Sequence, residues 1–187
     1  MIRGGVLETL VIINHDSQLF DASAACGLVA DAIATNRTLT DVGLLCVSLW
    51  DDAAAATALL RALTGHPTLG GLDISFNLAR DQNAAGAALG RLVAANAPAL
   101  KQLVIESCEL RDDGLRPLLE ALTQNTHLLN LYFTNNPVSC EFARDVVVPA
   151  VRANTSLRKL GAGQVGQPPI LELCEAVGLV MARGAVV

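Results

Sequence analysis

The sequence predicts an α/β repeat architecture in which a parallel β-sheet lines the concave face and helices cover the convex face. Three observations support this prediction. Six segments align on the pattern Leu-x-x-Leu-x-Leu, with other apolar residues at some of its positions. Each of the first five precedes a stretch with helical apolar spacing, and four of these five stretches end at Asn. Because repetition at a regular period indicates stacked supersecondary units, we expect one right-handed β-α superhelix.

The strand segments begin at Leu7, Leu39, Leu69, Leu100, Leu128 and Leu157, with spacings of 28 to 32 residues. Apolar residues stand at the first, fourth and sixth positions of each segment. The fourth and sixth are separated by one more variable residue, and this spacing of two is typical of a short strand. We therefore expect a single domain over 1–187. Its predicted repeats are about 7–38, 39–68, 69–99, 100–127 and 128–156, with 157–187 as a C-terminal capping segment.

The helical stretch of each repeat begins at an acidic or hydroxyl residue, whose side chain can accept the free amide hydrogens of a helix start. The expected N-caps are Asp21, Asp51, Asp81, Asp112 and Ser139. The acidic pairs Asp51–Asp52 and Asp112–Asp113 resemble acid–base pairs, but the positive end of a helix dipole accounts for negative charge at these places.

Four helical stretches end at Asn36, Asn96, Asn125 and Asn154, and Gly65 stands at the corresponding place in the second repeat. Gly and Asn enter the left-handed conformation at the lowest steric cost, so we expect them to stop the helices in that conformation. Pro149 falls inside the fifth helical stretch, and its missing amide hydrogen predicts a kink or an early end there.

The segments LKQLVIESCELRDDGLRPLLEALTQNTHL, from Leu100, and LLNLYFTNNPVSCEFARDVVVPAVRANTSL, from Leu128, resemble leucine-rich repeats of the ribonuclease-inhibitor-like type. The resemblance covers about Leu7 to Leu160 and implies a leucine-rich-repeat solenoid. In that family, Asn or Cys at the ninth position satisfies backbone groups where the chain leaves the strand. Asn77, Cys108 and Asn136 occupy this position here, whereas His15 and Val47 depart from the pattern and predict irregular turns.

The segment ANTSLRKLG, a Pro-containing stretch and a last apolar stretch follow one another in an order that resembles the C-terminal repeat region of tropomodulins, which bind actin. This likeness implies an actin-binding cytoskeletal module as an alternative function. A GTPase activator of the nuclear-transport type shares the repeat and implies a regulator of a small GTPase, although its activating residues have no counterpart that we can place on this chain.

Composition excludes several function classes. The formal charge of −5 with scattered Lys and Arg gives no basic footprint, so we expect no nucleic-acid partner. The sequence has no apolar run of about 20 residues and no signal-peptide pattern, so we expect a cytoplasmic protein without membrane contact.

The five cysteines, which are Cys26, Cys46, Cys108, Cys140 and Cys174, lack metal-ligand spacing and are expected to be buried free thiols.

The motifs that suggest chemistry are better explained by structure. GAGQVG, at 161–166, matches G-x-G-x-x-G, but Pro168 and Pro169 follow it and no further strand–helix unit comes after them. The histidines, His15, His66 and His127, stand in predicted turns without a nucleophile motif beside them. We therefore expect no catalytic site, no metal and no cofactor, and interpret the chain as a non-enzymatic protein-interaction module.

The concave strand face is the expected binding surface for a protein partner. Positions 3, 5 and 7 of each strand segment point to it, because alternate strand residues face opposite sides. The candidate binding residues are Asp41, Asp73, Gln102, Glu106, Asn130, Tyr132 and Thr134. Tyr132 is the expected anchor, since tyrosine supplies a large contact area with little side-chain freedom to lose.

Val11, Ile13 and Leu45 form an apolar zone on the N-terminal strands. This zone predicts either an interface, including self-association through the N-terminal repeat, or a place that preceding repeats or a cap cover. The tail from Pro168 to Val187 contains an apolar helical run, which predicts a C-terminal cap or, alternatively, a partner-binding helix.

Overall fold

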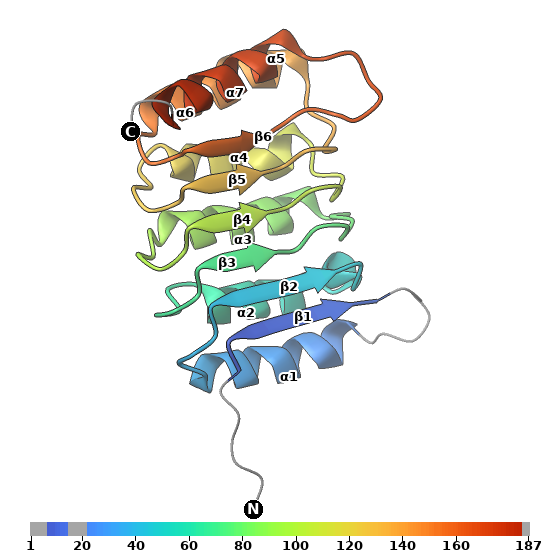
Figure 1. Ribbon diagram of the computed structural model, residues 1–187. Coiled ribbons are helices and arrows are strands. Elements are labelled where there is room, and N and C mark those ends of the chain that lie inside the picture. Colours follow the sequence, from blue (N-terminus) through green and yellow to red (C-terminus); the bar gives the residue numbers. More distant parts are fainter. Residues whose placement is uncertain (1–6, 15–21, 185–187) are drawn as a thin grey trace, which may run out of the picture.

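The computed structural model describes residues 7–14 and 22–184, and these form one parallel β-sheet with helices on one side (Figure 1). The six strands follow one another in chain order across the sheet. Their bounds are β1 Thr9–Ile13, β2 Asp41–Leu45, β3 Gly71–Asp73, β4 Gln102–Val104, β5 Asn130–Tyr132 and β6 Lys159–Gly161. The predicted parallel sheet is therefore present.

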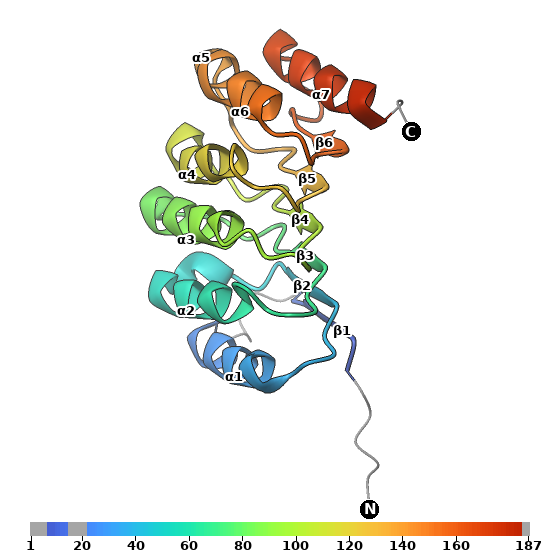
Figure 2. The same ribbon diagram turned by 90° about the vertical axis from the view of Figure 1, so that its left-hand side faces the viewer.

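The helices lie behind the sheet as a second layer, except for α7, which lies across the end of the sheet beyond β6 (Figure 2). They are α1 Ala22–Thr35, the 3-10 turn η1 Leu49–Asp51, α2 Ala53–Leu63, α3 Gln82–Ala94, α4 Asp112–Leu122, α5 Cys140–Phe142, the π-helical segment η2 Ala143–Val147, α6 Val148–Ala153 and α7 Leu171–Gly184. The column of strands bows toward the helices, so the other side of the sheet is the inner side of a shallow arc. We call this uncovered side the open face.

The core fills the space between the two layers. Positions 4 and 6 of the strand segments point into it, as Leu72, Ile74, Leu103 and Ile105 show with 0 to 1% exposure. Helix residues with a 3- or 4-residue spacing face them, among them the buried Leu115, Leu118, Leu119 and Leu122 of α4. The alternation in each strand thus separates a buried face from the open face.

Asn at the ninth position of a repeat ties the turns of two repeats together. The Asn136 side chain accepts hydrogen bonds from the amides of Cys108 and Leu110, at 3.2 and 2.9 Å, and donates to the carbonyls of Ile105 and Phe133, at 2.8 and 2.9 Å. Asn77 makes the same set of hydrogen bonds between the second and third repeats. It accepts from the amides of Val47 and Leu49 and donates to the carbonyls of Leu44 and Ile74. Both side chains are buried, so these bonds replace water for the backbone.

The helix starts follow the prediction at two places and differ at two others. The side chains of Asp81 and Ser139 accept amide hydrogens as N-caps. In the second repeat the cap is Asp52 and not Asp51, because the buried Leu49 and Trp50 add the 3-10 turn η1 before the helix.

In the fourth repeat the residue before the helix is Arg111, so the predicted cap Asp112 is wrong. Asp112 begins α4, and its carboxylate accepts hydrogen bonds from the amide and hydroxyl of Ser139, at 3.0 and 2.6 Å. Asp112 therefore supports the start of the next repeat's helix. Asp21 lies outside the described residues.

The helix ends use Asn differently from the prediction. Only Gly65 and Asn96 of the five expected residues have a positive φ, at 74° and 49°. Asn36, Asn125 and Asn154 instead accept two backbone amide hydrogens each with their side-chain oxygens. The Asn154 amide also donates to the carbonyls of Leu122 and Asn125, at 2.9 and 2.7 Å, which connects successive repeats.

Pro149 produces the predicted irregularity. The fifth helical stretch is split into α5, the π-helical segment η2 and α6, and Pro149 stands in the first turn of α6. A proline ring cannot donate the i to i−4 hydrogen bond, so the widened π-helical turn precedes it.

The prediction that all cysteines are buried is wrong for Cys140 and Cys174, which are exposed; Cys26 and Cys108 are buried, and Cys46 is half-buried. Cys140 begins α5 at the surface, and Cys174 lies on an exposed side of α7 that faces the segment 162–169. All five are free thiols. Within the described ranges, no helix has both the length and the apolar character needed to cross a lipid bilayer.

Candidate binding face

The strand register brings the candidate residues together on the open face. Thr9, Asp41, Gly71, Gln102, Asn130 and Lys159 form one row across the sheet, and Val11, Gly43, Asp73, Val104, Tyr132 and Gly161 form the next. Ile13 and Leu45 begin a third row, which Ser75, Glu106 and Thr134 continue beyond the paired strands. All seven residues proposed for binding therefore lie in three neighbouring rows.

A mostly apolar hollow of about 260 Å³ lies over β1, β2 and β3 on this face. Its walls include Val11 and Ile13, which are 55% and 50% exposed, and the half-buried Leu45. Gly43 forms the floor: a Cβ atom there would lie 3.2 to 3.4 Å from the side chains of Leu45 and Val11. The hollow exists because β2 has no side chain at this position.

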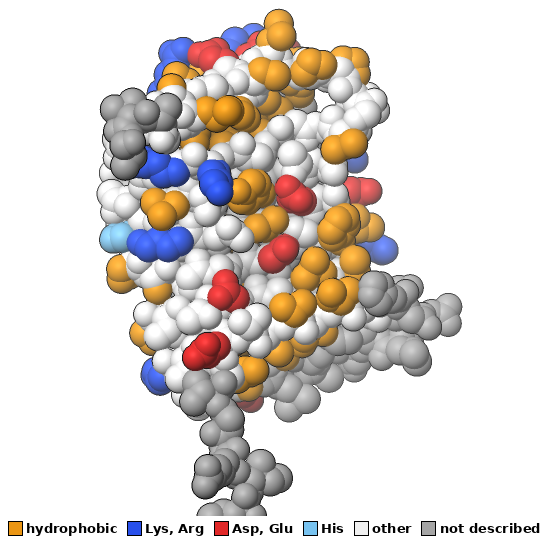
Figure 3. Space-filling view, viewed as in Figure 1, with side chains coloured by type: hydrophobic (Ala, Val, Ile, Leu, Met, Phe, Trp, Pro, Cys, Tyr) orange, Lys and Arg blue, Asp and Glu red, His pale blue; other side chains and the backbone are white. Residues whose placement is uncertain are grey.

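Three carboxylates cross the open face along the edge of the hollow: Asp41 and Asp73, which belong to its lining, and Glu106. One oxygen of each is held by a neighbouring hydroxyl: Thr40 for Asp41 at 2.8 Å, Ser75 for Asp73 at 2.6 Å, and Thr134 for Glu106. Figure 3, which shows this face, has acidic side chains following one another across its middle and hydrophobic side chains gathered beside them. The carboxylates are thus fixed in orientation and accessible.

The Tyr132 ring lies on the open face between polar neighbours. A Cβ atom on Gly161, its partner on β6, would be 2.6 Å from the Tyr132 Cδ1 atom, so the ring leans over that strand. Asn130 donates to Gln102 at 3.3 Å in the row beside it. Tyr132 is half-buried, and its ring lies against Gly161.

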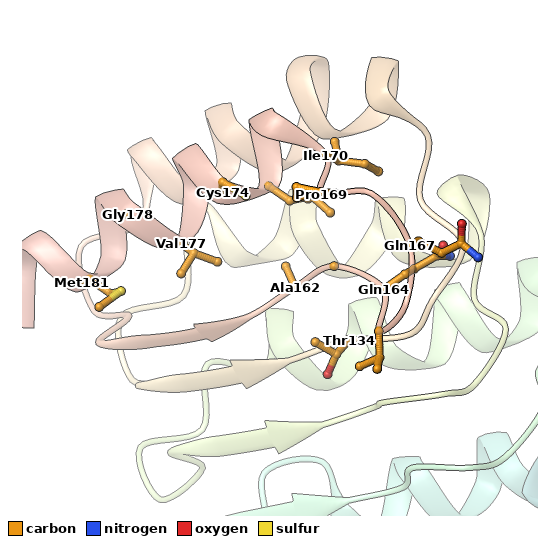
Figure 4. A pocket seen from close by; sticks show the side chains of 13 residues that line it. Thr134, Ala162, Gln164, Gln167, Pro169, Ile170, Cys174, Val177, Gly178 and Met181 are labelled. Atoms are coloured by element: carbon orange, nitrogen blue, oxygen red, sulfur yellow. The ribbon is translucent and has the colours of Figure 1, made fainter.

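A second surface feature, which sequence reasoning missed, is a groove of about 460 Å³ at the C-terminal end. It lies between the segment 162–169 and α7 (Figure 4). Its lining is mostly apolar and includes Val165, Ile170, Val177 and Met181, with the exposed Cys174 thiol. The glycine-rich GAGQVG segment forms part of one wall, with positive φ at Gly163 and Gly166.

The histidines and cysteines have structural surroundings. His66 is 5% exposed, and its Nε2 atom lies 3.0 Å from the Asn36 carbonyl oxygen. Burial raises the pKa of the Cys108 thiol to about 12, and the thiol donates to the carbonyl of Ile74 at 3.4 Å. In the described part of the chain, no three His, Cys, Asp or Glu side chains form a group suited to a metal ion. His15 is outside that part.

Comparison with known proteins gives structural neighbours only. No protein-family model matches the chain, and no curated protein sequence does so either. Among solved structures, the chain is similar to leiomodin-1 actin-binding site 2, with a TM-score of 0.65 and 15% identity over 84% of this chain and 90% of that one. It is also similar to a tropomodulin C-terminal domain from Caenorhabditis elegans, with a TM-score of 0.63 and 16% identity over 89% and 96%. These likenesses show a shared fold.

Proposed function

We propose that the chain is a leucine-rich-repeat solenoid of the ribonuclease-inhibitor type that binds a protein partner through its open face. The observation that carries the proposal is the uncovered parallel sheet. The strands of parallel sheets are normally covered on both sides, whereas here α1 to α6 lie on one side and α7 packs across the end of the sheet at β6 (Figure 2). An uncovered sheet with half-exposed Val11 and Ile13 is the kind of surface that an interface covers.

The composition of the open face supports a protein ligand. It combines an apolar hollow, a half-exposed tyrosine and fixed polar groups, and protein interfaces join apolar and aromatic contacts with a polar rim in this way. The proposal assigns the chain no catalytic step, no metal and no cofactor. It places the protein in the cytoplasm, where its free thiols stay reduced.

Actin is the first specific partner to test. The chain shares its fold, along most of its length, with leiomodin-1 actin-binding site 2, which by its name binds actin. We propose the same ligand here as one case of the general function. A regulator of a small GTPase is the remaining alternative, and stimulated hydrolysis by a panel of purified GTPases tests it directly.

The test is sedimentation of the purified protein with actin filaments, together with affinity capture from cell extract. Binding through the open face predicts that Val11→Gln and Tyr132→Ala lower the bound fraction, while Glu120→Gln on the exposed side of α4 leaves it unchanged. Failure to pellet with actin removes actin and leaves the general proposal. Equal capture by all variants contradicts the assignment of the open face.

A further inference from the structure

The open face has an uneven charge distribution that specifies a class of partner. Asp41, Asp73 and Glu106 occupy positions 3, 5 and 7 of the consecutive strand segments of β2, β3 and β4. Each step moves one strand across, about 4.8 Å, and two residues along, about 6.6 Å, which places successive carboxylates about 8 Å apart on a diagonal. The row from Asp41 to Glu106 is therefore about 16 Å long.

No described Lys, Arg or His forms an ion pair with this row. The ion pairs between described residues are Arg144–Asp145 and Arg152–Glu175, both formed by residues of the helical layer. Only one oxygen of each of the three carboxylates has a hydrogen-bond donor from the described residues, so the second oxygen remains for a ligand. A partner that approaches this face meets three fixed negative charges.

The carboxylate row runs beside the apolar hollow, and this combination selects the occupant. Asp41 and Asp73 belong to the lining of the hollow together with Val11, Ile13 and Leu45. A ligand that uses both features needs cationic side chains along one line and apolar side chains next to them. A row of about 16 Å equals about three turns of an α-helix at 5.4 Å per turn.

We infer that the open face binds a basic amphipathic helix of a partner protein. This inference rests on the proposed function and names the partner's chemistry at the same face. Lys or Arg residues at i, i+4, i+7 and i+11 face Asp41, Asp73 and Glu106, and the neighbouring apolar stripe covers Val11 and Ile13. The carboxylates provide orientation and salt-dependent attraction, and the hollow provides apolar burial.

The test uses three synthetic peptides of about 18 residues, which is long enough for the three turns. The first is an Ala/Leu/Lys helix with the Lys spacing given above. In the second Glu replaces every Lys, and the third has the composition of the first in a shuffled order that separates no faces. We expect the first peptide to bind, with an affinity that falls as salt rises, and the other two to bind at least tenfold more weakly. Equal binding of the Glu peptide or the shuffled peptide overturns the inference.

Protein variants locate the site on the parent fold. The triple variant Asp41→Asn, Asp73→Asn, Glu106→Gln keeps the hydrogen-bond acceptors and removes three charges, and it should weaken the basic peptide at least tenfold. A matched control removes three charges from exposed helical residues: Asp31→Asn, Glu120→Gln and Glu141→Gln. This control should change binding less than twofold, and an equal loss in both triples overturns the inference.

Two further outcomes separate this inference from the proposed function. Val11→Gln should weaken the basic peptide without changing the salt dependence of its binding, since it removes only an apolar contact. If Val11→Gln and Tyr132→Ala reduce capture of a natural partner while the charge-neutral triple does not, the open face binds proteins but the basic helix is wrong. If none of these variants changes capture, the proposed function itself fails.

Discussion

The two ends of the sheet are built differently, although the same strand–helix unit leads to both. At the C-terminal end α7 packs on β6 and buries Leu173, Ala176 and Val180, and Arg183 donates to the Val151 carbonyl at 2.7 Å. At the N-terminal end every β1 residue is exposed or half-buried. In a stack of repeats the neighbours on both sides bury each strand. A terminal strand is therefore buried only where a cap covers it.

The polar connections between repeats show the same gradient. Asn125, Asn136 and Asn154 are each hydrogen-bonded through both side-chain ends in the C-terminal half. In the N-terminal half Val47 has no polar side chain at the ninth position. In the structure the counterpart of Asn36, Asn125 and Asn154 in the second repeat is His66, three residues before Leu69, and not Gly65. The buried Nδ1 atom of His66 has no hydrogen-bond partner among the described residues. Asn77 is fully bonded, so the less completely bonded part is the second repeat, which contains Val47 and His66.

The largest expected effect comes from the cap. Leu173→Ala should lower the free energy of unfolding by about 3 kcal/mol, since it removes a side chain that is 3% exposed and leaves a cavity. Val11→Ala at the other end should cost less than about 0.5 kcal/mol because that side chain is half in water. Urea denaturation of both variants measures the difference. Equal losses would show that the two ends are equally packed.

Asn136→Ala tests the polar connection in the C-terminal half. We expect a loss of about 2–3 kcal/mol in the free energy of unfolding, because two buried amides and two buried carbonyls lose their partner. Asn83→Ala, at an exposed position of α3, is the matched control and should change stability by less than about 0.5 kcal/mol. Thermal melting that is the same for Asn136→Ala and the parent would contradict this role.

Tyr132→Ala tests the open face itself. We expect partner capture to weaken by about 2 kcal/mol, or about thirtyfold, as for an aromatic anchor of an interface. Stability should fall by about 1 kcal/mol because part of the ring packs over Gly161. Titration of the captured partner, with circular dichroism as the folding control, measures both values. Unchanged capture places the interface elsewhere, with the groove beside α7 as the next surface to examine.

His66→Asn tests whether restoring the Asn hydrogen bonds stabilises the second repeat, and its expected effect is the smallest. An Asn side chain there should accept the backbone amides two and three residues later, as Asn36 does at 2.7 Å. We expect a gain of about 1 kcal/mol, the net contribution of a typical buried hydrogen bond. A calorimetric melting temperature above the parent's supports the comparison, and a lower one shows that the imidazole ring fills space that the amide cannot.

The strand register was predictable because its signal is periodic. Leu72, Ile74, Leu103 and Ile105 alternate with the open-face residues, and a shift by one residue would place these aliphatic side chains in water. The sequence also indicated the irregular helix at Pro149, since the missing amide hydrogen is a local property. Local and periodic signals thus gave the layers, their order and the rows of the candidate face.

Features that depend on two repeats at once were not predictable in this way. Asp112 has the composition of a cap, but it bonds to Ser139 of the following repeat. Asn154 was expected to stop its helix in the left-handed conformation, yet it is extended and bonds to Leu122 and Asn125. The groove beside α7 likewise requires the position of the last helix relative to β6, which no single segment encodes.

Three glycines of the open face shape its surface, because each leaves room for a side chain of the preceding strand. Val11, Asp41 and Tyr132 are each registered with a glycine on the next strand, at Gly43, Gly71 and Gly161, and a Cβ atom there would lie within 2.5 to 3.4 Å of them. The direction in which each of these side chains points therefore depends on the absence of a side chain at a residue about thirty positions later in the chain. Substitution of such a glycine would re-aim a contact residue while leaving that residue unchanged, so inherited variation in binding can arise at positions that no ligand touches.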